Sequence, residues 1–242
     1  MNLLLIGAPG VGKGTISRYL IENYQMKHIS TGDILREAVA SKTELGLKVK
    51  EFMDTGTLVP DQIILDIIKE TLAKSDSSKG FIFDGFPRTI NQANEFEKIL
   101  NELNSKIDRV IALDVEDDVV IKRVTGRRVC SKCNTIYNIY YKAPQVENKC
   151  DNCGGDLYTR NDDNLDSLKK RLSEYHINSE SLISFYDGKG IVRHINADTT
   201  REKEYETLEE ILKEVKWFLL NLKERLILWK KLVQSWLEFI RD

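Results

Sequence analysis

A glycine-rich stretch near the N-terminus has the residue types and spacing needed to bind phosphate. The sequence GAPGVGKGT occupies residues 7–15. Glycines let backbone amides approach phosphate oxygens, and a lysine at position 13 can reach the outer phosphates of a ligand. The strict form of this motif has Ser or Thr directly after the lysine, whereas this chain has Gly14 and then Thr15. The stretch therefore predicts a phosphate-binding loop of a variant type.

A second group of polar residues follows a later apolar run. The sequence FDGFPRT occupies residues 83–89, so Asp84 ends an apolar run and Arg88 follows four residues later. A carboxylate at the end of a buried strand can organise hydrated Mg²⁺ beside a phosphate loop. Arg88 can direct forked donors at phosphate. Between the two motifs, ISTGDILR (residues 29–36) adds a capped helix start and a further arginine, Arg36.

The cysteines form a third constellation. All four, Cys130, Cys133, Cys150 and Cys153, lie in two CxxC pairs separated by sixteen residues. This is the spacing of two zinc knuckles, and four thiolates make a closed tetrahedral site, which predicts a structural Zn²⁺. Residues 127–164 are too few to build a hydrophobic core, so the metal would hold this segment together.

The elements that must position these residues follow from apolar patterning. Short, mainly apolar runs at residues 3–6, 81–83 and 110–115 predict buried strands. Helical periodicity follows the first run from Thr15 and the third run around residues 119–124. This alternation predicts an α/β fold, with a parallel sheet flanked by helices in three layers.

Composition excludes several classes of protein. Of the 242 residues, 41% are hydrophobic and 31% are charged, which is too apolar for a disordered chain. The net charge of −2 lacks the basic excess typical of nucleic-acid binding, so we expect no nucleic-acid partner. The start of the chain lacks a signal-peptide pattern and no long apolar span is present, so we expect a cytoplasmic protein.

Taken together, these motifs resemble the adenylate kinase family, in its long-lid, zinc-containing type. The resemblance extends from Met1 to about Lys213 and depends on motifs in matching order and spacing. They are GAPGVGKGT (7–15), ISTGDILR (29–36), GTLVPD (56–61), FDGFPRT (83–89), GRRVC (126–130) and TRNDD (159–163).

The resemblance implies a P-loop fold that catalyses the reversible reaction ATP + AMP = 2 ADP with Mg²⁺, serving adenine nucleotide balance. It also implies a division of the chain. Residues 1–29, 60–126 and 165–214 would form the core, 30–59 an AMP-binding insert, and 127–164 a zinc-binding lid. The insert and the lid would close over AMP and ATP respectively, so that water cannot take the phosphoryl group.

Site residues are implied position by position. The expected ATP-binding residues are Gly10, Val11, Gly12, Lys13, Gly14, Thr15, Arg123, Arg127, Ile136 and Tyr137. The expected AMP-binding residues are Thr31, Arg36, Thr57, Leu58, Val59, Gly85, Phe86, Pro87, Arg88, Gln92, Arg160 and Arg171. The residues expected to act in catalysis are Lys13, Asp84, Arg88, Arg123, Arg127, Arg160 and Arg171.

This chemistry favours arginines because they pair bidentately with phosphate and stay charged. It needs no general base, because the AMP phosphate is largely ionised at neutral pH, and we therefore interpret His28, His176 and His194 as surface or packing residues.

Two alternatives to an adenylate kinase are a UMP/CMP-type kinase, which generally has a shorter lid, and a binding module on a P-loop scaffold.

The last segment, residues 215–242, lies beyond the resemblance. Apolar residues recur there at spacings of three and four, which predicts an amphipathic helix with a wide apolar face. Three partners fit such a helix: the protein's own core, a second copy of the chain, or a membrane surface.

Overall fold

The protein's structure, a computed structural model, describes residues 1–75 and 78–215. The chain divides into two compact units, Met1–Asp198 and Thr199–Asp242. The described part of the second unit contains a helix over residues 201–215. The expected amphipathic helix over residues 215–242 lies almost entirely outside the described residues. Among the described helices, none combines the length and the apolar character needed to cross a membrane.

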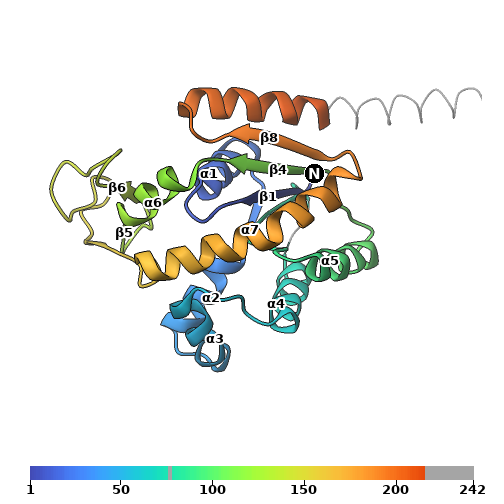
Figure 1. The fold of residues 1–242 in the computed structure, drawn as a ribbon, viewed down its shortest axis with the longest axis horizontal. Coiled ribbons are helices and arrows are strands. Elements are labelled where there is room, and N and C mark those ends of the chain that lie inside the picture. The colour runs from blue at the N-terminus through green and yellow to red at the C-terminus, as the bar shows by residue number, and fades with distance from the viewer. Residues whose placement is uncertain (76–77, 216–242) are drawn as a thin grey trace, which may run out of the picture. The chain divides into compact units, whose positions relative to one another are not determined.

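A parallel sheet forms the centre of the first unit (Figure 1). Its described strands lie in the order β2-β3-β1-β4-β8, and each neighbouring pair is parallel. Their bounds are β1 (Leu3–Gly7), β2 (Lys27–Ser30), β3 (Phe81–Asp84), β4 (Arg109–Asp114) and β8 (Val192–Asn196). Helices flank this sheet, so the predicted α/β class is confirmed.

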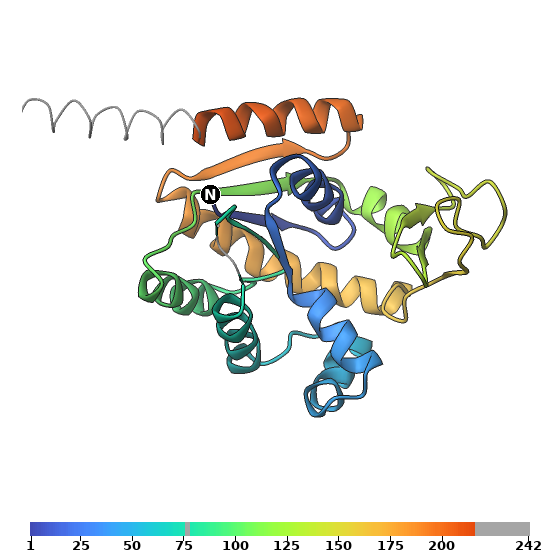
Figure 2. The ribbon, with the colours of Figure 1, turned by 180° about the vertical axis from the view of Figure 1, so that it is seen from behind.

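The described helices of the first unit connect these strands and cover both faces of the sheet. They are α1 (Lys13–Tyr24), α2 (Thr31–Ala40), α3 (Glu44–Thr55), α4 (Asp61–Ala73), α5 (Ile90–Glu102), α6 (Asp117–Thr125) and α7 (Leu165–Asp187). Figures 1 and 2 show the sheet from opposite sides, with α7 in front of it in the first view and α1 in front of it in the second.

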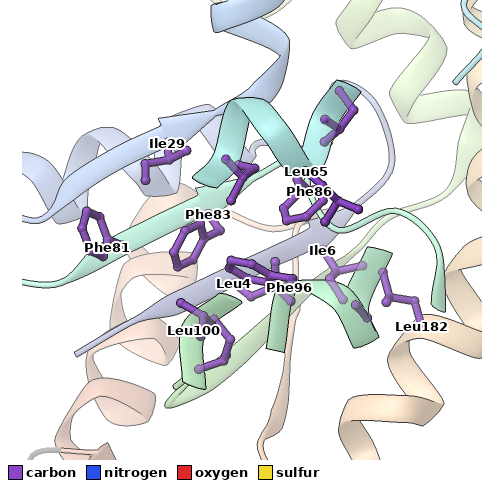
Figure 3. Close-up of a cluster of buried hydrophobic side chains, with 14 of the residues drawn as sticks. Leu4, Ile6, Ile29, Leu65, Phe81, Phe83, Phe86, Phe96, Leu100 and Leu182 are labelled. Atoms are coloured by element: carbon purple, nitrogen blue, oxygen red, sulfur yellow. The ribbon is translucent and has the colours of Figure 1, made fainter. Parts of the chain in front are cut away.

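Strand β1 is buried on both faces because its sequence carries apolar side chains at successive positions. Leu3, Leu4 and Leu5 are all at most 2% exposed. Successive side chains of a strand point to opposite faces, so an uninterrupted apolar run suits a strand between two helical layers. Leu4 belongs to a buried cluster that includes residues of α4, α5 and α7 (Figure 3). Phe96 of α5 is central to it, with its ring centroid 4.8 Å from that of Phe83.

A small antiparallel sheet lies within residues 127–164. Strand β5 (Arg127–Cys130) pairs with β6 (Ile136–Asn138) on one side and with β7 (Leu157–Tyr158) on the other. Its buried cluster consists of Cys130, Tyr137, Cys150 and Leu157. So small an apolar cluster cannot stabilise a separate fold unaided.

Helices α2 and α3 pack closely against each other at a glycine. Each begins with a side-chain cap: the Ser30 hydroxyl accepts a hydrogen bond from the amide of Asp33, and the Thr43 hydroxyl accepts one from the amide of Gly46. A Cβ at Gly46 would lie only 2.1 Å from the carbonyl oxygen of Ala38. The contact between the two helices therefore requires glycine at this position.

We predict that Gly46→Ala destabilises the α2–α3 pair, although alanine favours helices in general. Overpacking of this kind costs about 1–3 kcal/mol, to be measured by urea unfolding together with the KM for AMP. Gly188→Ala is the matched control, since a Cβ at Gly188 has its nearest contact at 3.5 Å. If Gly46→Ala and Gly188→Ala have the same free energy of unfolding, the close approach of α2 and α3 at Gly46 is contradicted.

Candidate functional site

The glycine-rich loop connects β1 to α1 at the carboxyl end of the sheet. Gly12 caps α1, whose first residue is Lys13. Gly10 has a φ of +81°, and a Cβ there would lie 2.3 Å from Cγ2 of Val124 on α6. The loop thus needs glycine both for its backbone conformation and for its packing against α6. The leading amides of a helix have no carbonyl partner in a preceding turn, and the helix dipole favours negative charge there, so the start of α1 is suited to bind an anion.

Lys13 reaches back over the loop. Its Nζ donates hydrogen bonds to the carbonyl oxygens of Gly7, at 2.7 Å, and Ala8, at 3.0 Å. Loss of hydration at this partly buried position lowers the pKa of Lys13 to about 8, while the charge of Asp84 opposes the change and nearby arginines add to it. A phosphate would supply the negative charge that stabilises the ammonium group.

Arg123 holds the same loop from the side of α6. Its guanidinium donates to the carbonyl oxygen of Val11, at 2.8 Å, and to that of Ala197, at 2.7 Å. The helix therefore places this arginine directly against the phosphate-binding loop. This is the position expected from its proposed contact with ATP.

Asp84 ends β3 and lies beside β1, where it is paired in register with Leu5. Burial alone would raise the pKa of the Asp84 carboxyl, but contact with His28 and the charge of Lys13 hold it below the usual value. Its Oδ2 lies 3.4 Å from Nε2 of His28, whose side chain is 20% exposed. No local sequence pattern predicts this contact, because His28 meets Asp84 only through the pairing of β2 with β3.

The loop after β3 is organised by hydrogen bonds to Gln92 and Thr31. The Gln92 side chain accepts a hydrogen bond from the amide of Arg88, at 2.7 Å, and donates to Oδ1 of Asp61, at 2.7 Å. The Gly85 carbonyl oxygen accepts from the Thr31 hydroxyl and from Nε of Arg88. Asp61 is a residue that sequence reasoning missed: it lies within the motif GTLVPD, but its partner is 31 residues away.

A pocket beside this loop brings together most of the residues expected at the AMP site. Its lining includes Thr31, Arg36, Thr57, Leu58, Val59, Gly85, Arg88, Gln92 and Arg171. Leu35, Phe52, Met53, Ile64 and Asp162 also line it and were not expected from sequence. The pocket thus combines an apolar wall with arginines, as a ligand with both an apolar and an anionic part requires.

Arginines from the segment 127–171 are paired with carboxylates next to this pocket. Arg127 donates from Nε to Oδ2 of Asp163, at 2.7 Å, and from Nη2 to Oδ1 of the same residue. Arg171 donates to Oδ2 of Asp162, at 3.1 Å. Burial lowers the pKa of Arg171 to about 10, with Asp162 opposing the change. Burial and the neighbouring charges of Arg36 and Arg127 also lower the pKa of Arg160.

Two of the expected binding residues point elsewhere. Phe86 is 1% exposed and packs on Phe96, with ring centroids 5.0 Å apart, so its side chain belongs to the core. Tyr137 is 3% exposed, and its hydroxyl accepts a hydrogen bond from the amide of Asp151. Any contact of Tyr137 with ATP would therefore come from its backbone.

The four cysteine sulfurs converge within residues 127–164, all within 4.8 Å of one another. Sγ of Cys130 lies 3.5 Å from that of Cys153, and Sγ of Cys133 lies 3.5 Å from that of Cys150. These separations are too long for disulfides, whose sulfurs lie about 2.05 Å apart. They are close to the ~3.8 Å edge of a tetrahedron with Zn–S bonds of about 2.3 Å. The sulfurs therefore fit a Cys₄ zinc site.

Comparison with known proteins gives a consistent result. The family model described as "Adenylate kinase" matches residues 5–191. The chain is 49% identical to "Adenylate kinase" of Caldicellulosiruptor bescii over 207 residues, which cover 84% of this chain and 96% of that protein. It is 47% identical to "Adenylate kinase" of Archaeoglobus fulgidus over 216 residues, which cover 89% and 100%.

Both the matched length and the identity are well above what a shared fold alone produces, and the matched region contains the phosphate loop, Asp84 and the cysteine cluster. The chain belongs to the adenylate kinase family.

Proposed function

We propose that this protein transfers the γ-phosphoryl group of ATP to AMP reversibly, giving two ADP. One observation carries the proposal: burial lowers the pKa of Lys13 in the phosphate loop, and Arg88 of the β3 loop, Arg171 of α7 and Arg127 of β5 lie near enough to lower it further. Cations from four separate elements have converged at the carboxyl end of the sheet. Their mutual repulsion is relieved when anionic ligands bind among them.

The proposed roles follow from charge. Phosphoryl transfer spreads negative charge over the equatorial oxygens, so fixed cations around the transferred group lower the barrier. Lys13 and Arg123 would hold the donor, Arg36 and Arg88 the AMP phosphate, and Arg127, Arg160 and Arg171 the groups between the two nucleotides. The acceptor phosphate has a second pKa near ~6 and is already nucleophilic at neutral pH, so no side chain has to remove a proton.

Asp84 is the residue we propose to organise hydrated Mg²⁺ with ATP. The Asp84 carboxyl is ionised at neutral pH, since its pKa is held low, and it ends the strand beside the phosphate loop. A bound Mg²⁺ would supply positive charge that offsets the negative charge developing on the phosphate oxygens. Asp84 would orient the ion through its carboxylate, whose Oδ2 lies 3.4 Å from Nε2 of His28.

The other proposed assignments divide the chain by substrate. Residues 30–59, which contain α2 and α3, would cover AMP, and residues 127–164, which contain the small sheet, would cover ATP. Support comes from Thr57, Leu58 and Val59, which line the same pocket as Arg88. Closure of both segments would exclude water from the reacting phosphates.

We also propose that Cys130, Cys133, Cys150 and Cys153 bind a structural Zn²⁺. A closed set of four thiolates leaves no open coordination position, so the metal would not take part in phosphoryl transfer. The amide of Lys132 lies 3.4 Å from Sγ of Cys130, a contact that stabilises a thiolate.

The substrate assignment is tested by coupled measurement of ADP formation with ATP and each of AMP, GMP, UMP and CMP. We expect substantial turnover with AMP and far less with the others. Turnover with UMP or CMP and none with AMP would place the chain with a different class of nucleotide kinase.

Lys13→Met should lower kcat by more than tenfold, which corresponds to at least ~1.4 kcal/mol of transition-state stabilisation. The reason is that methionine keeps the length of the side chain but removes the cation at the phosphate loop. Lys98→Met, at an exposed position on α5 whose lysine pairs with Glu95, serves as the matched control. If Lys13→Met retained more than a tenth of the wild-type kcat, the proposed role of Lys13 would be contradicted.

Cys150→Ser should lower the melting temperature, because the metal substitutes for a hydrophobic core in residues 127–164. Turnover at low temperature should change little, since the metal stands outside the chemistry. Metal analysis of protein purified without chelator should give about one zinc per chain for the wild type. Wild-type protein without zinc would contradict the assignment, and Cys150→Ser that melted at the wild-type temperature would do the same.

A further inference from the structure

An acidic side chain occupies part of the arginine-lined pocket. Asp162 lies at the end of the segment 127–164, just before α7, and its carboxylate lines the pocket together with Arg36, Arg88 and Arg171. Its Oδ2 accepts a hydrogen bond from Nη1 of Arg171, at 3.1 Å, and lies 3.9 Å from Nη1 of Arg36. Arg36 also has a closer carboxylate partner, because its Nη2 donates to Oδ1 of Asp33 at 2.5 Å. A carboxylate among the cations proposed to bind the AMP phosphate opposes that binding, and therefore calls for an explanation.

The next residue, Asp163, provides a contrast within the same segment. Its side chain is 0% exposed, and both of its oxygens accept hydrogen bonds from Arg127. Asp163 is thus a fixed partner that orients one arginine. Asp162 is 13% exposed, faces the pocket, and engages only one of its carboxylate oxygens with Arg171, whose Nη1 also donates to the backbone carbonyl oxygen of Asp162 at 3.2 Å. A one-oxygen contact at the edge of a pocket is more easily exchanged than a buried two-oxygen contact.

We propose that the Asp162 carboxylate is a displaceable counter-ion of the AMP phosphate site, which neutralises Arg171, adds to the charge of Asp33 beside Arg36, and gives up both arginines when the nucleotide phosphate binds. The inference rests on the proposed function and extends it to selectivity. Its chemistry is the exchange of one anion for another at the same guanidinium groups.

This exchange favours a nucleotide over a bare anion. A pocket with several unpaired arginines would bind any small phosphate or sulfate ion tightly. With Asp162 in place, an incoming anion must first displace the carboxylate. Inorganic phosphate has only its charge to offer, whereas AMP also gains contacts along Thr57, Leu58 and Val59. The carboxylate therefore weakens the binding of both inorganic phosphate and AMP. Only AMP retains enough binding energy to occupy the site, because of its additional contacts.

The same exchange assists release. After transfer, ADP must leave the arginines, and a nearby carboxylate offers them a replacement partner. Removal of the negative charge at residue 162 should therefore strengthen binding at this site and slow the departure of the nucleotide. A structural defect would change the two kinetic constants differently, because it would raise the KM for AMP while lowering kcat.

The test is Asp162→Asn, which removes the charge but keeps the size of the side chain. Inorganic phosphate should inhibit the variant, competitively with AMP, at a concentration about fivefold lower than for the wild type. The KM for AMP should fall by a similar factor, and kcat should fall with it. Asp162→Ala should shift phosphate inhibition in the same direction, which covers the case in which asparagine packs badly.

Asp166→Asn is the matched control, since it removes one negative charge from the exposed first turn of α7, four residues away. Its phosphate inhibition and KM for AMP should equal those of the wild type. Calorimetric titration of each protein with inorganic phosphate, without nucleotides, gives a readout that does not depend on turnover. Tighter phosphate binding by Asp162→Asn would support the counter-ion role even if the reaction were a different one. Unchanged or weaker binding by both Asp162 variants would overturn it.

Discussion

Repulsion among like charges is the constraint that the site must satisfy. Lys13, Arg88, Arg127 and Arg171 come from different elements, yet they lie near enough for the arginines to lower the pKa of Lys13. No local conformational preference of the chain would bring these four cations together. The free energy that holds them close must therefore come from burial of the apolar side chains of the sheet. The cluster of Leu4, Phe83 and Phe96 beneath the site fixes β1 and β3 side by side, and both strands end at the site. Phosphoryl transfer then uses the positive potential that packing has created.

The chain limits this potential with carboxylates of its own, which differ in how firmly they are held. The Asp163 side chain is fully buried against Arg127 and orients its guanidinium group. Asp84 balances Lys13 at the sheet edge and presents an ionised carboxylate for a hydrated cation. Asp162 contacts Arg171 at the rim of the pocket, where a ligand can replace it. In the roles proposed for them, these carboxylates would serve orientation, metal binding and exchange, depending on burial and on the number of oxygens engaged.

Sequence reasoning predicted the parts of the fold that local pattern encodes. The apolar runs of β1, β3 and β4, the glycine loop and the cysteine spacing are all contiguous signals. Strands β2 and β8 were missed because KHIS and VRHIN mix charged and apolar residues, and only their pairing with β3 and β4 defines them. Asp61 and His28 were missed for the same reason, since each meets its partner across the fold. For Asp162 a signal existed: two adjacent acids within TRNDD, beside an arginine.

Strand β5 joins the metal cluster to the arginine cluster. It begins at Arg127 and ends at Cys130, so an arginine of the proposed phosphate site and a cysteine of the proposed metal site lie three residues apart on one strand. Strand β5 is in turn held between β6 and β7, and the buried cluster of this sheet includes Tyr137, whose hydroxyl lies 3.5 Å from Sγ of Cys150. A lid with so little apolar burial could not hold Arg127 at a fixed position without a further constraint. A Zn²⁺ ion bound by the four cysteines would supply that constraint, so the proposed metal site and the proposed role of Arg127 depend on the same short strand.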